Sequence, residues 1–297
     1  MTISAAATLR ARIGAAAGDP LVLVGCVDAL TARIAVEAGF EAVYATGAGI
    51  ANSQLGVPDI GLLTGSEMLA QVERIVSAVD VPVVADIDTG YGSALNAARA
   101  VRLFERAGAA GIQIENQVFP KQCGHFDGTQ VVPLPEFLGK LAAVLDARSD
   151  SDLVVIARTD SLASRGVDDA IERGHAFVDA GADVVFVEAP PSREILERLP
   201  TLIPAPLLAN VVEGGRTPEL SAAELGAAGY RIILFANTAL RLAAHAIRDG
   251  LTVLRRDGTS RTLHDRLLPW DERQRLVGLD DYRALAERYA TVENQSR

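Results

Sequence analysis

Two aspartates, Asp86 and Asp88, stand two residues apart in the segment ADIDTGYG, at the end of a short apolar run. Glu115 ends the next such run, and Asp59 lies in a loop that precedes both. Oxygen ligands without histidine or cysteine favour Mg²⁺ or Mn²⁺, which keep several waters and leave positions open for a substrate. A D-x-D pair alone is weak evidence for a metal. Its position at a strand end beside Glu115 leads us to predict a Mg²⁺ or Mn²⁺ site.

A second chemically active segment, KQCGH at residues 121–125, lies in a long loop after the fourth apolar run. A cysteine close to lysine and histidine is expected to have a stabilised thiolate and to exchange protons near neutral pH. The loop from Gln117 to Gly128 is long enough to act as a lid. We therefore predict proton transfer by Cys123 and interpret Cys26 as small buried filler. The other histidines, His175, His245 and His264, are interpreted as surface residues.

Eight short apolar runs recur along the chain without polar alternation, which is typical of parallel strands buried on both faces. Ala-rich stretches of helical period separate them and predict a closed (β/α)8 TIM barrel. A doubly wound sheet would carry G-x-G-x-x-G after its first strand, and VGCVDALT lacks it. The predicted strands are Leu21–Gly25, Ala42–Thr46, Pro82–Asp86, Gly111–Glu115, Leu153–Ala157, Asp183–Glu188, Pro206–Asn210 and Arg231–Ala236; predicted helices include Ser66–Val79, Leu95–Gly108, Leu134–Arg148 and Asp168–Gly181.

Polar residues stand at or just after the end of every predicted strand. In a barrel these ends converge on one mouth, which holds the active site. An isolated acid at a strand end is usually a helix cap, and that alternative stays open for Asp28 and Asp160. The set comprises Asp28, Thr46, Asp86, Asp88, Glu115, Arg158, Asp160, Glu188, Asn210 and Asn237.

The length and composition suit one large barrel as well as two ordinary domains. Because no linker or low-complexity tract divides the chain, we predict one barrel domain over residues 1–297, with an N-terminal helix and a helical C-terminal tail from about residue 256. The net charge of −10 argues against a nucleic-acid partner, which needs a basic face. Two cysteines predict a reducing compartment, and no run approaches the roughly 20 apolar residues of a membrane span. Arg10 and Arg12 interrupt the first segment, so we interpret it as an amphipathic surface helix and expect a cytoplasmic protein.

Five segments resemble, in order, the motifs of the isocitrate lyase/phosphoenolpyruvate mutase superfamily: ADIDTGYG, IENQVFPKQCGH, IARTDSL, FVEAP and LANVVEGGRTP. The similarity runs from about Val22 to Arg256 and is greatest to short members such as the 2-methylisocitrate and 2,3-dimethylmalate lyases. It implies a barrel whose last helix is swapped between subunits, a homotetramer built as a dimer of dimers, an essential Mg²⁺ and a small di- or tricarboxylate substrate.

The resemblance also implies roles for single residues. Cys123 becomes the general acid, Arg158 stabilises developing negative charge, and Lys121, His125 and Tyr44 complete the catalytic group. Asp59, Asp86, Asp88 and Glu115 become the metal-site carboxylates, some of them through water. Thr46, Gly47 and Ala48, with Tyr44, would hold the half that forms an α-keto acid, while Glu188 and Asn210 would orient the other half. Gly124, Glu213 and Asn237 complete the implied substrate-binding set.

These roles imply a Mg²⁺-dependent carbon–carbon lyase. It would cleave a 2-hydroxy dicarboxylic acid, of the 2-alkylmalate, dimethylmalate or methylisocitrate type, into an α-keto acid and a carboxylic acid by retro-aldol chemistry. Two departures matter: Asn116 stands where the family usually has Asp, and Glu213-Gly214-Gly215 differs from the Glu-Phe-Gly of 2-methylisocitrate lyases. Because Arg241 is expected to point away from the mouth, we predict a dicarboxylate rather than a tricarboxylate.

Three alternatives remain open at this point. The first is a phosphonomutase acting on carboxyphosphonoenolpyruvate, or a C–P hydrolase. The second is an oxaloacetate decarboxylase or hydrolase on the same scaffold. The third is a barrel retained without catalysis, which is disfavoured because Cys123, Arg158 and all four carboxylates are present.

Overall fold

The computed structural model describes residues 3–15, 19–126 and 128–293, with side chains up to residue 290. The chain divides into two compact units, Met1–Arg241 and Leu242–Arg297, which we describe separately. The assignment of a single domain over residues 1–297 stays a prediction.

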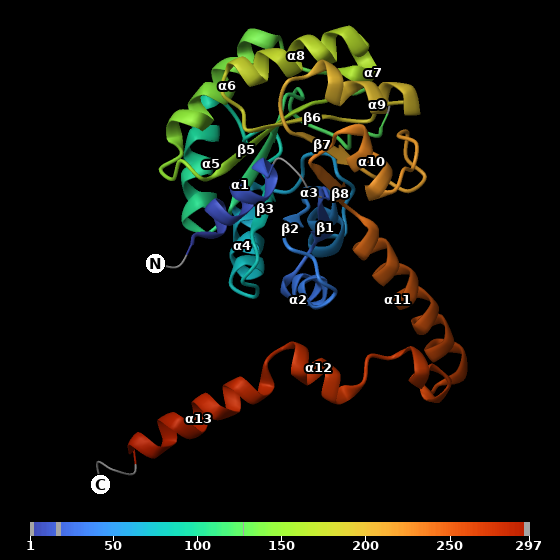
Figure 1. Ribbon diagram of the computed structural model, residues 1–297. Coiled ribbons are helices and arrows are strands. Elements are labelled where there is room, and N and C mark those ends of the chain that lie inside the picture. The colour runs from blue at the N-terminus through green and yellow to red at the C-terminus, as the bar shows by residue number, and fades with distance from the viewer. Residues whose placement is uncertain (1–2, 16–18, 127, 294–297) are drawn as a thin grey trace. The chain divides into compact units, whose positions relative to one another are not determined.

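The first unit is a closed barrel of eight parallel strands in sequence order, with β1 paired to β8 (Figure 1). The predicted fold class is confirmed, and each strand begins and ends within two residues of its predicted bounds. A Cβ added to Gly25 would lie 1.8 Å from the carbonyl oxygen of Ala236, so only glycine fits this seam between β1 and β8. The strands are β1 Leu21–Cys26, β2 Val43–Ala45, β3 Val83–Asp86, β4 Gly111–Glu115, β5 Val154–Thr159, β6 Val184–Val187, β7 Leu207–Asn210 and β8 Ile232–Phe235.

Two apolar layers alternate along each strand. One fills the barrel, as Leu23, Tyr44 and Phe186 do, and the other packs against the surrounding helices. Because side chains alternate with period two, the inward positions at the strand ends are the polar ones predicted above. The register places Glu115 of β4 opposite Arg158 of β5.

Helices follow the strands and cover the barrel (Figure 1). Helix α4 illustrates how the sequence forms them. Thr64 and Glu67 make a capping box at its start, and Met68, Val72 and Ile75 bury one stripe. The helical segments of this unit include α2 Ala29–Glu37, α3 Gly47–Ile50, the π-helical turn η1 Ala51–Leu55, α4 Gly65–Val76, α5 Ala94–Arg106, α6 Leu134–Ala147, α7 Leu162–Arg165, α8 Val167–Asp179, α9 Arg193–Leu202 and α10 Ala222–Ala228.

The N-terminal helix α1 (Ala5–Gly14) has one buried side and one exposed side, as an amphipathic surface helix does. Leu9 is 1% exposed and belongs to the apolar layer inside the barrel. A Cβ added to Gly111, the first residue of β4, would lie 3.1 Å from Cδ2 of Leu9. The helix therefore packs against the ends of the strands opposite the mouth, and Arg10 anchors it through Asp183 at 2.8 Å.

The C-terminal tail contains helical segments. Helix α11 (Thr238–Asp257) begins in the first unit, and η2 (Arg261–Arg266), α12 (Trp270–Leu276) and α13 (Leu279–Glu293) follow. Several large apolar side chains of this second unit are exposed, among them Leu251, Trp270 and Tyr282. No helix in the described part of the chain is long and apolar enough to cross a membrane.

Candidate active site

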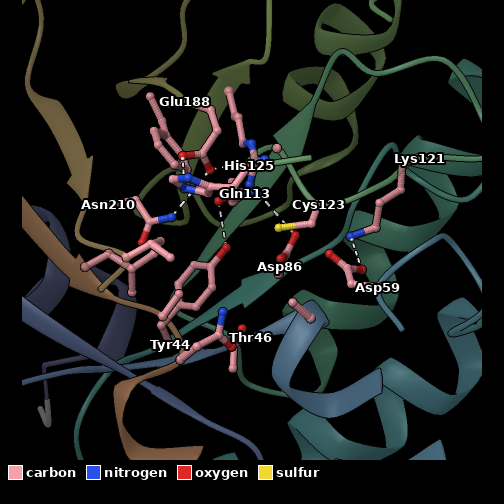
Figure 2. A pocket seen from close by; sticks show the side chains of 18 residues that line it. Tyr44, Thr46, Asp59, Asp86, Gln113, Lys121, Cys123, His125, Glu188 and Asn210 are labelled. Atoms are coloured by element: carbon pink, nitrogen blue, oxygen red, sulfur yellow. Dashed lines mark hydrogen bonds and ion pairs between the residues drawn. The ribbon is translucent and has the colours of Figure 1, made fainter. Parts of the chain in front are cut away.

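The mouth of the barrel contains a pocket into which most of the predicted site residues project (Figure 2). Strands β2 to β8 contribute residues at or near their carboxyl ends, and the loop after β4 contributes Lys121 to His125. The convergence expected of a barrel is therefore observed. The pocket is lined by Tyr44, Thr46, Ala48, Asp59, Asp86, Gln113, Lys121, Cys123, Gly124, His125, Arg158, Phe186, Glu188, Asn210, Val212, Leu234, Ala236 and Asn237.

Three acids and one lysine form the first cluster. Asp88 has a left-handed backbone (φ 48°), which aspartate tolerates better than most residues, and its amide donates to Oδ1 of Asp86 at 3.1 Å. Nζ of Lys121 lies 2.6 Å from Oδ1 of Asp59 and 2.7 Å from Oδ1 of Asp88. Burial raises the pKa of Asp88 to about 6 against the lowering effect of Lys121, and the charge of Asp86 adds to the increase.

The cluster suits a hard divalent cation, although it is not a closed cage. A Cβ added to Gly47 would lie 3.0 Å from Oδ2 of Asp86 and 3.2 Å from Oδ1 of Asp88, so both carboxylates face one point. Glu115 is buried nearby, and its Oε1 has no hydrogen-bond partner among the described residues. No group of three His, Cys, Asp or Glu in the described chain could by itself hold a metal ion. This donor set fits Mg²⁺ with several retained waters.

Arg158 is the centre of the second cluster, and it is surrounded by carboxylates. It forms a bidentate pair with Asp160, at 2.9 Å through Nε and 2.7 Å through Nη2. It also lies 3.4 Å from Glu115 and 3.1 Å from Glu188. Asp160 is therefore not a helix cap but the side chain that fixes Arg158. Asp28, the other open case, does cap a helix, because it accepts a hydrogen bond from the amide of Thr31 at 2.7 Å.

His125 joins the loop after β4 to the loop after β7. Its Nε2 lies 3.2 Å from Oε1 of Glu188, and its Nδ1 accepts a hydrogen bond from the amide of Arg216 at 3.2 Å. A Cβ added to Gly215 would lie 2.8 Å from Nδ1 of His125, so the imidazole occupies the space that a side chain at 215 would need. This contact gives a structural reason for glycine at the end of the Glu213-Gly214-Gly215 segment.

The thiol of Cys123 is half-buried at the wall of the pocket, between the two clusters (Figure 2). Burial raises its pKa, and the charges of Glu188 and Asp59 raise it further, against the lowering effects of a backbone hydrogen bond from His125 and the charge of Arg158. The expectation of a stabilised thiolate is therefore wrong, because Lys121 and His125 direct their nitrogens at carboxylates instead. A thiol that keeps its proton is suited to act as an acid. Cys26 is buried as predicted, and burial raises its pKa to about 12.

Gln113 is a pocket residue that was not predicted from the sequence. It lies on the inward face of β4, two residues before Glu115, and accepts a 2.6 Å hydrogen bond from the hydroxyl of Tyr44. Its amide donates to Oδ1 of Asp86 at 3.3 Å, so it connects Tyr44 to the acidic cluster. A polar residue in an otherwise apolar strand, in step with Glu115, was the signal that could have revealed it.

The remaining predicted residues divide into two groups. Thr46, Ala48, Asn210 and Asn237 line the pocket, while the amide of Gly47 donates to Asp86 behind it. Glu213 is not among the lining residues. Its carboxylate binds the hydroxyl of Thr238 and pairs with Arg241 at 3.1 Å. Arg241 is thus engaged away from the pocket, in agreement with its expected direction. The predicted surface histidines, His175, His245 and His264, are exposed.

Side chains from seven strands and one long loop thus meet in a single mouth, an arrangement that defines a (β/α)8-barrel enzyme. A family model described as phosphoenolpyruvate phosphomutase matches residues 13–254. The 2,3-dimethylmalate lyase of Eubacterium barkeri is 45% identical, over 91% of this chain and 94% of its own. The 2-methylisocitrate lyase of Aeropyrum pernix is 40% identical, over 89% and 85%. The chain belongs to the phosphoenolpyruvate mutase/isocitrate lyase superfamily and is a lyase within it.

Solved structures agree with this assignment. A crystal structure of 2,3-dimethylmalate lyase matches with a TM-score of 0.91 and 40% identity, covering 97% of this chain and 96% of that one. Oxaloacetate acetylhydrolase bound to 3,3-difluorooxalacetate matches with a TM-score of 0.91 and 37% identity, covering 97% and 98%. Phosphonopyruvate hydrolase with oxalate and Mg²⁺ matches with a TM-score of 0.86 and 32% identity, covering 97% and 99%.

Proposed function

We propose that this enzyme is a Mg²⁺-dependent lyase that cleaves an alkyl-substituted 2-hydroxy dicarboxylic acid, such as dimethylmalate or a 2-alkylmalate, into an α-keto acid and a carboxylic acid. The observation that carries the proposal is the position of Cys123. Its protonated thiol faces the same pocket as the buried Arg158 and the acidic cluster. Besides a base for the 2-hydroxyl proton, such a cleavage needs an acid, an anion-stabilising cation and a metal-binding edge.

The chain's own residues account for most of the reaction. A carboxylate of the acidic cluster accepts the proton of the 2-hydroxyl, the bond between C2 and C3 breaks, and its electron pair forms an enediolate on the departing acid. Arg158 is placed to stabilise that oxyanion, because its guanidinium is buried and held by Asp160. The thiol of Cys123 gives its proton to C3. Tyr44, fixed by Gln113, is placed to orient the half that becomes the keto acid.

The acidic cluster of Asp59, Asp86, Asp88 and Glu115 would hold the metal, partly through water. When bound, Mg²⁺ supplies positive charge to the oxygens of the keto-acid half. Lys121 already neutralises part of this cluster, since it contacts Asp59 and Asp88. The superfamily relative solved with oxalate and Mg²⁺ supports the choice of metal.

The charges in the pocket favour a dicarboxylate. Among its lining residues the basic groups are Lys121, His125 and Arg158, and each is already paired with at least one carboxylate. A third substrate carboxylate would therefore enter without a cation of its own, and an unpaired buried charge is costly. Gly214 lies in the segment where 2-methylisocitrate lyases carry Phe. Its backbone is left-handed (φ 72°), a conformation that is unfavourable for a residue with a bulky side chain.

The test is a screen of the purified enzyme for α-keto acid release. The panel comprises dimethylmalate, 2-alkylmalates, malate, isocitrate, 2-methylisocitrate and oxaloacetate, each with Mg²⁺. We expect the alkylated dicarboxylates to be cleaved fastest. Oxaloacetate is itself an α-keto acid, so its turnover is followed as its loss with formation of oxalate and acetate. If oxaloacetate alone is consumed, the result favours the hydrolase alternative, which the likeness to oxaloacetate acetylhydrolase supports. A ³¹P assay with carboxyphosphonoenolpyruvate tests the phosphonomutase alternative.

The assembly and location also stay predictions. We infer a homotetramer, a dimer of dimers in which the last helix is swapped between subunits, and the exposed apolar residues of α11 to α13 support a partner for this unit. Light scattering of the purified protein tests the tetramer. A cytoplasmic location is tested by cell fractionation.

A further inference from the structure

Gln117 is a buried side chain that connects the loop of residues 121–125 to the support of Arg158. Its Oε1 accepts a hydrogen bond from the amide of Gln122 at 2.9 Å. Its Nε2 donates to the carbonyl oxygen of Gln122 at 2.8 Å and to Oδ1 of Asp160 at 3.0 Å. One primary amide thus pairs with the peptide groups of the residue before Cys123 and with the carboxylate that binds Arg158.

The same loop packs directly on the Arg158 pair at its other end. A Cβ added to Gly124 would lie 2.5 Å from Oδ1 of Asp160 and 2.6 Å from Nη2 of Arg158. Oδ1 of Asp160 therefore accepts hydrogen bonds from Gln117 and Arg158 and also lies close to the backbone of Gly124. A displacement of the loop would therefore change the surroundings of Arg158. The hydrogen bonds of Gln117 connect the loop to Asp160 as well.

The side chain of Gln117 is not needed to hold its own backbone. Residues 116–118 pair with residues 130–132: the amide of Val118 donates to Gln130 and that of Val132 donates to Asn116, each at 2.9 Å. Gln117 also lies outside the set of residues that line the pocket. Its amide is buried, with 3% of the residue exposed, and both its oxygen and its nitrogen are used. A side chain so placed acts through its neighbours.

We propose that Gln117 is a positioning residue that holds the proton-donating loop in register with Arg158, so that the donor and the anion-binding group occupy the site together. The proposal rests on the proposed function for the roles of Cys123 and Arg158. Only an amide offers both a donor for Asp160 and an acceptor for the Gln122 amide. Glutamate would place a second carboxylate against Asp160, and methionine would remove all three hydrogen bonds at nearly constant size.

The experiment measures the rate at which iodoacetamide alkylates Cys123 in the substrate-free enzyme, by mass spectrometry of the peptide. Gln117→Met should accelerate this reaction about three- to tenfold, since a lost hydrogen bond shifts a local equilibrium by that order. Cys26 is fully buried and serves as the internal control for global loosening. Gln130→Glu changes an exposed amide of the same hairpin and should leave the rate at the wild-type value. Gln117→Glu is the second variant, because it keeps an oxygen that accepts from the amide of Gln122 but loses the N–H donor to Asp160.

Two further measurements separate this role from a merely structural one. Asp160→Ala removes the oxygen that accepts from the Gln117 amide and should also accelerate alkylation. The double variant with Gln117→Met should be no faster than the faster single variant, because both changes break the same link. With the best substrate, Gln117→Met should lower kcat by more than it raises KM. An unchanged alkylation rate, additive effects or equal exposure of Cys26 would each overturn the proposal. If the alkylation pattern holds but no 2-hydroxy acid is cleaved, the proposed function fails and the link through Gln117 stands.

Discussion

Nζ of Lys121 lies 2.7 Å from Oδ1 of Asp88, within a cluster of acids at the barrel mouth. Although burial alone lowers the pKa of Lys121, the charges of the neighbouring carboxylates, that of Asp88 first, raise it well above its ordinary value, so the ammonium stays charged. One ammonium does not balance Asp59, Asp86 and Asp88 together. The excess negative charge is the physical reason to expect a divalent cation here.

Removal of the metal should abolish activity. We expect EDTA to stop turnover and Mg²⁺ or Mn²⁺ to restore it, with full activity after rigorous chelation as the contradicting result.

Calorimetry should show that Asp86→Ala loses Mg²⁺ binding while the unfolding transition remains cooperative. Because burial raises the pKa of Asp88 to about 6, Mg²⁺ affinity in the wild type should fall as the pH drops through 6. Asp28→Ala is the matched control: it loses a helix cap, about 0.5–2 kcal/mol, and keeps the metal.

Replacement of Cys123 by Ser or Ala should lower kcat by roughly 10²–10⁴, the usual contribution of a positioned proton donor. Substrate affinity should change little. Because burial raises the pKa of this thiol above the ordinary 9.0, the proton stays on sulfur through neutral pH. The midpoint of the alkaline decline of kcat due to this group should therefore lie above pH 9.0, and a midpoint near pH 7 would contradict it. Cys26→Ala, in the buried layer, should leave the pH profile unchanged.

Gly124→Ala should impair catalysis without unfolding the barrel. The new methyl group would lie within 2.6 Å of Asp160, Glu188 and Arg158, so the loop could not rest on them. We expect kcat/KM to fall by at least about tenfold, as for other displacements of catalytic groups. Gly139→Ala provides the control in α6, where a Cβ meets nothing within 4 Å and should stabilise the helix by roughly 0.5–1 kcal/mol.

Dimethylmalate should be preferred over 2-methylisocitrate by at least roughly tenfold in kcat/KM, which corresponds to about 1.4 kcal/mol. The reason is that every basic side chain lining the pocket already has a carboxylate partner. Side-by-side kinetics on the two compounds decide the question. Faster turnover of the tricarboxylate would mean that another basic group reaches the site.

Glu188 should make stability depend on acid pH. Although burial alone raises its pKa, Arg158 and His125 lower it to about 2. A depressed folded-state pKa gives stability that is complete above the unfolded value of 4.5 and is lost as the pH falls toward 2. In urea unfolding, the deficit of Glu188→Gln relative to wild type should thus shrink between pH 5 and pH 3. A deficit that is constant with pH would refute this linkage.

Much of the architecture could be predicted because it depends on local patterns. Continuous apolar runs identify strands that are buried on both faces, and the polar residue after each run identifies the mouth. The direction of single charges could not be predicted in this way. Lys121 and His125 flank Cys123 in sequence, but each turns to a carboxylate from elsewhere in the chain, so the thiol is not activated. Glu213 similarly turns to Arg241.

The position of helix α1 could likewise not be predicted from local sequence patterns. Its sequence is typical of a surface helix, and in the structure only Ala6, Leu9 and Ile13 are buried in it. Which end of a barrel such a small apolar stripe covers is a tertiary property. Gln113 and Gln117 were missed for a related reason: a glutamine carries no charge to draw notice, and its importance lies in the partners that folding brings to it.

The pairing of Glu115 with Arg158 across β4 and β5 makes these strands intolerant of length changes. An insertion or deletion of one residue would turn the arginine out among the helices and bring an aliphatic neighbour inward, reversing two faces at once. The loop after β7 is under no such restriction, and it meets the loop after β4 at Arg216 and His125. A change in the loop after β7 can therefore alter the substrate pocket, which Val212 lines, while the strands and the loop that carries Cys123 keep the catalytic groups in place.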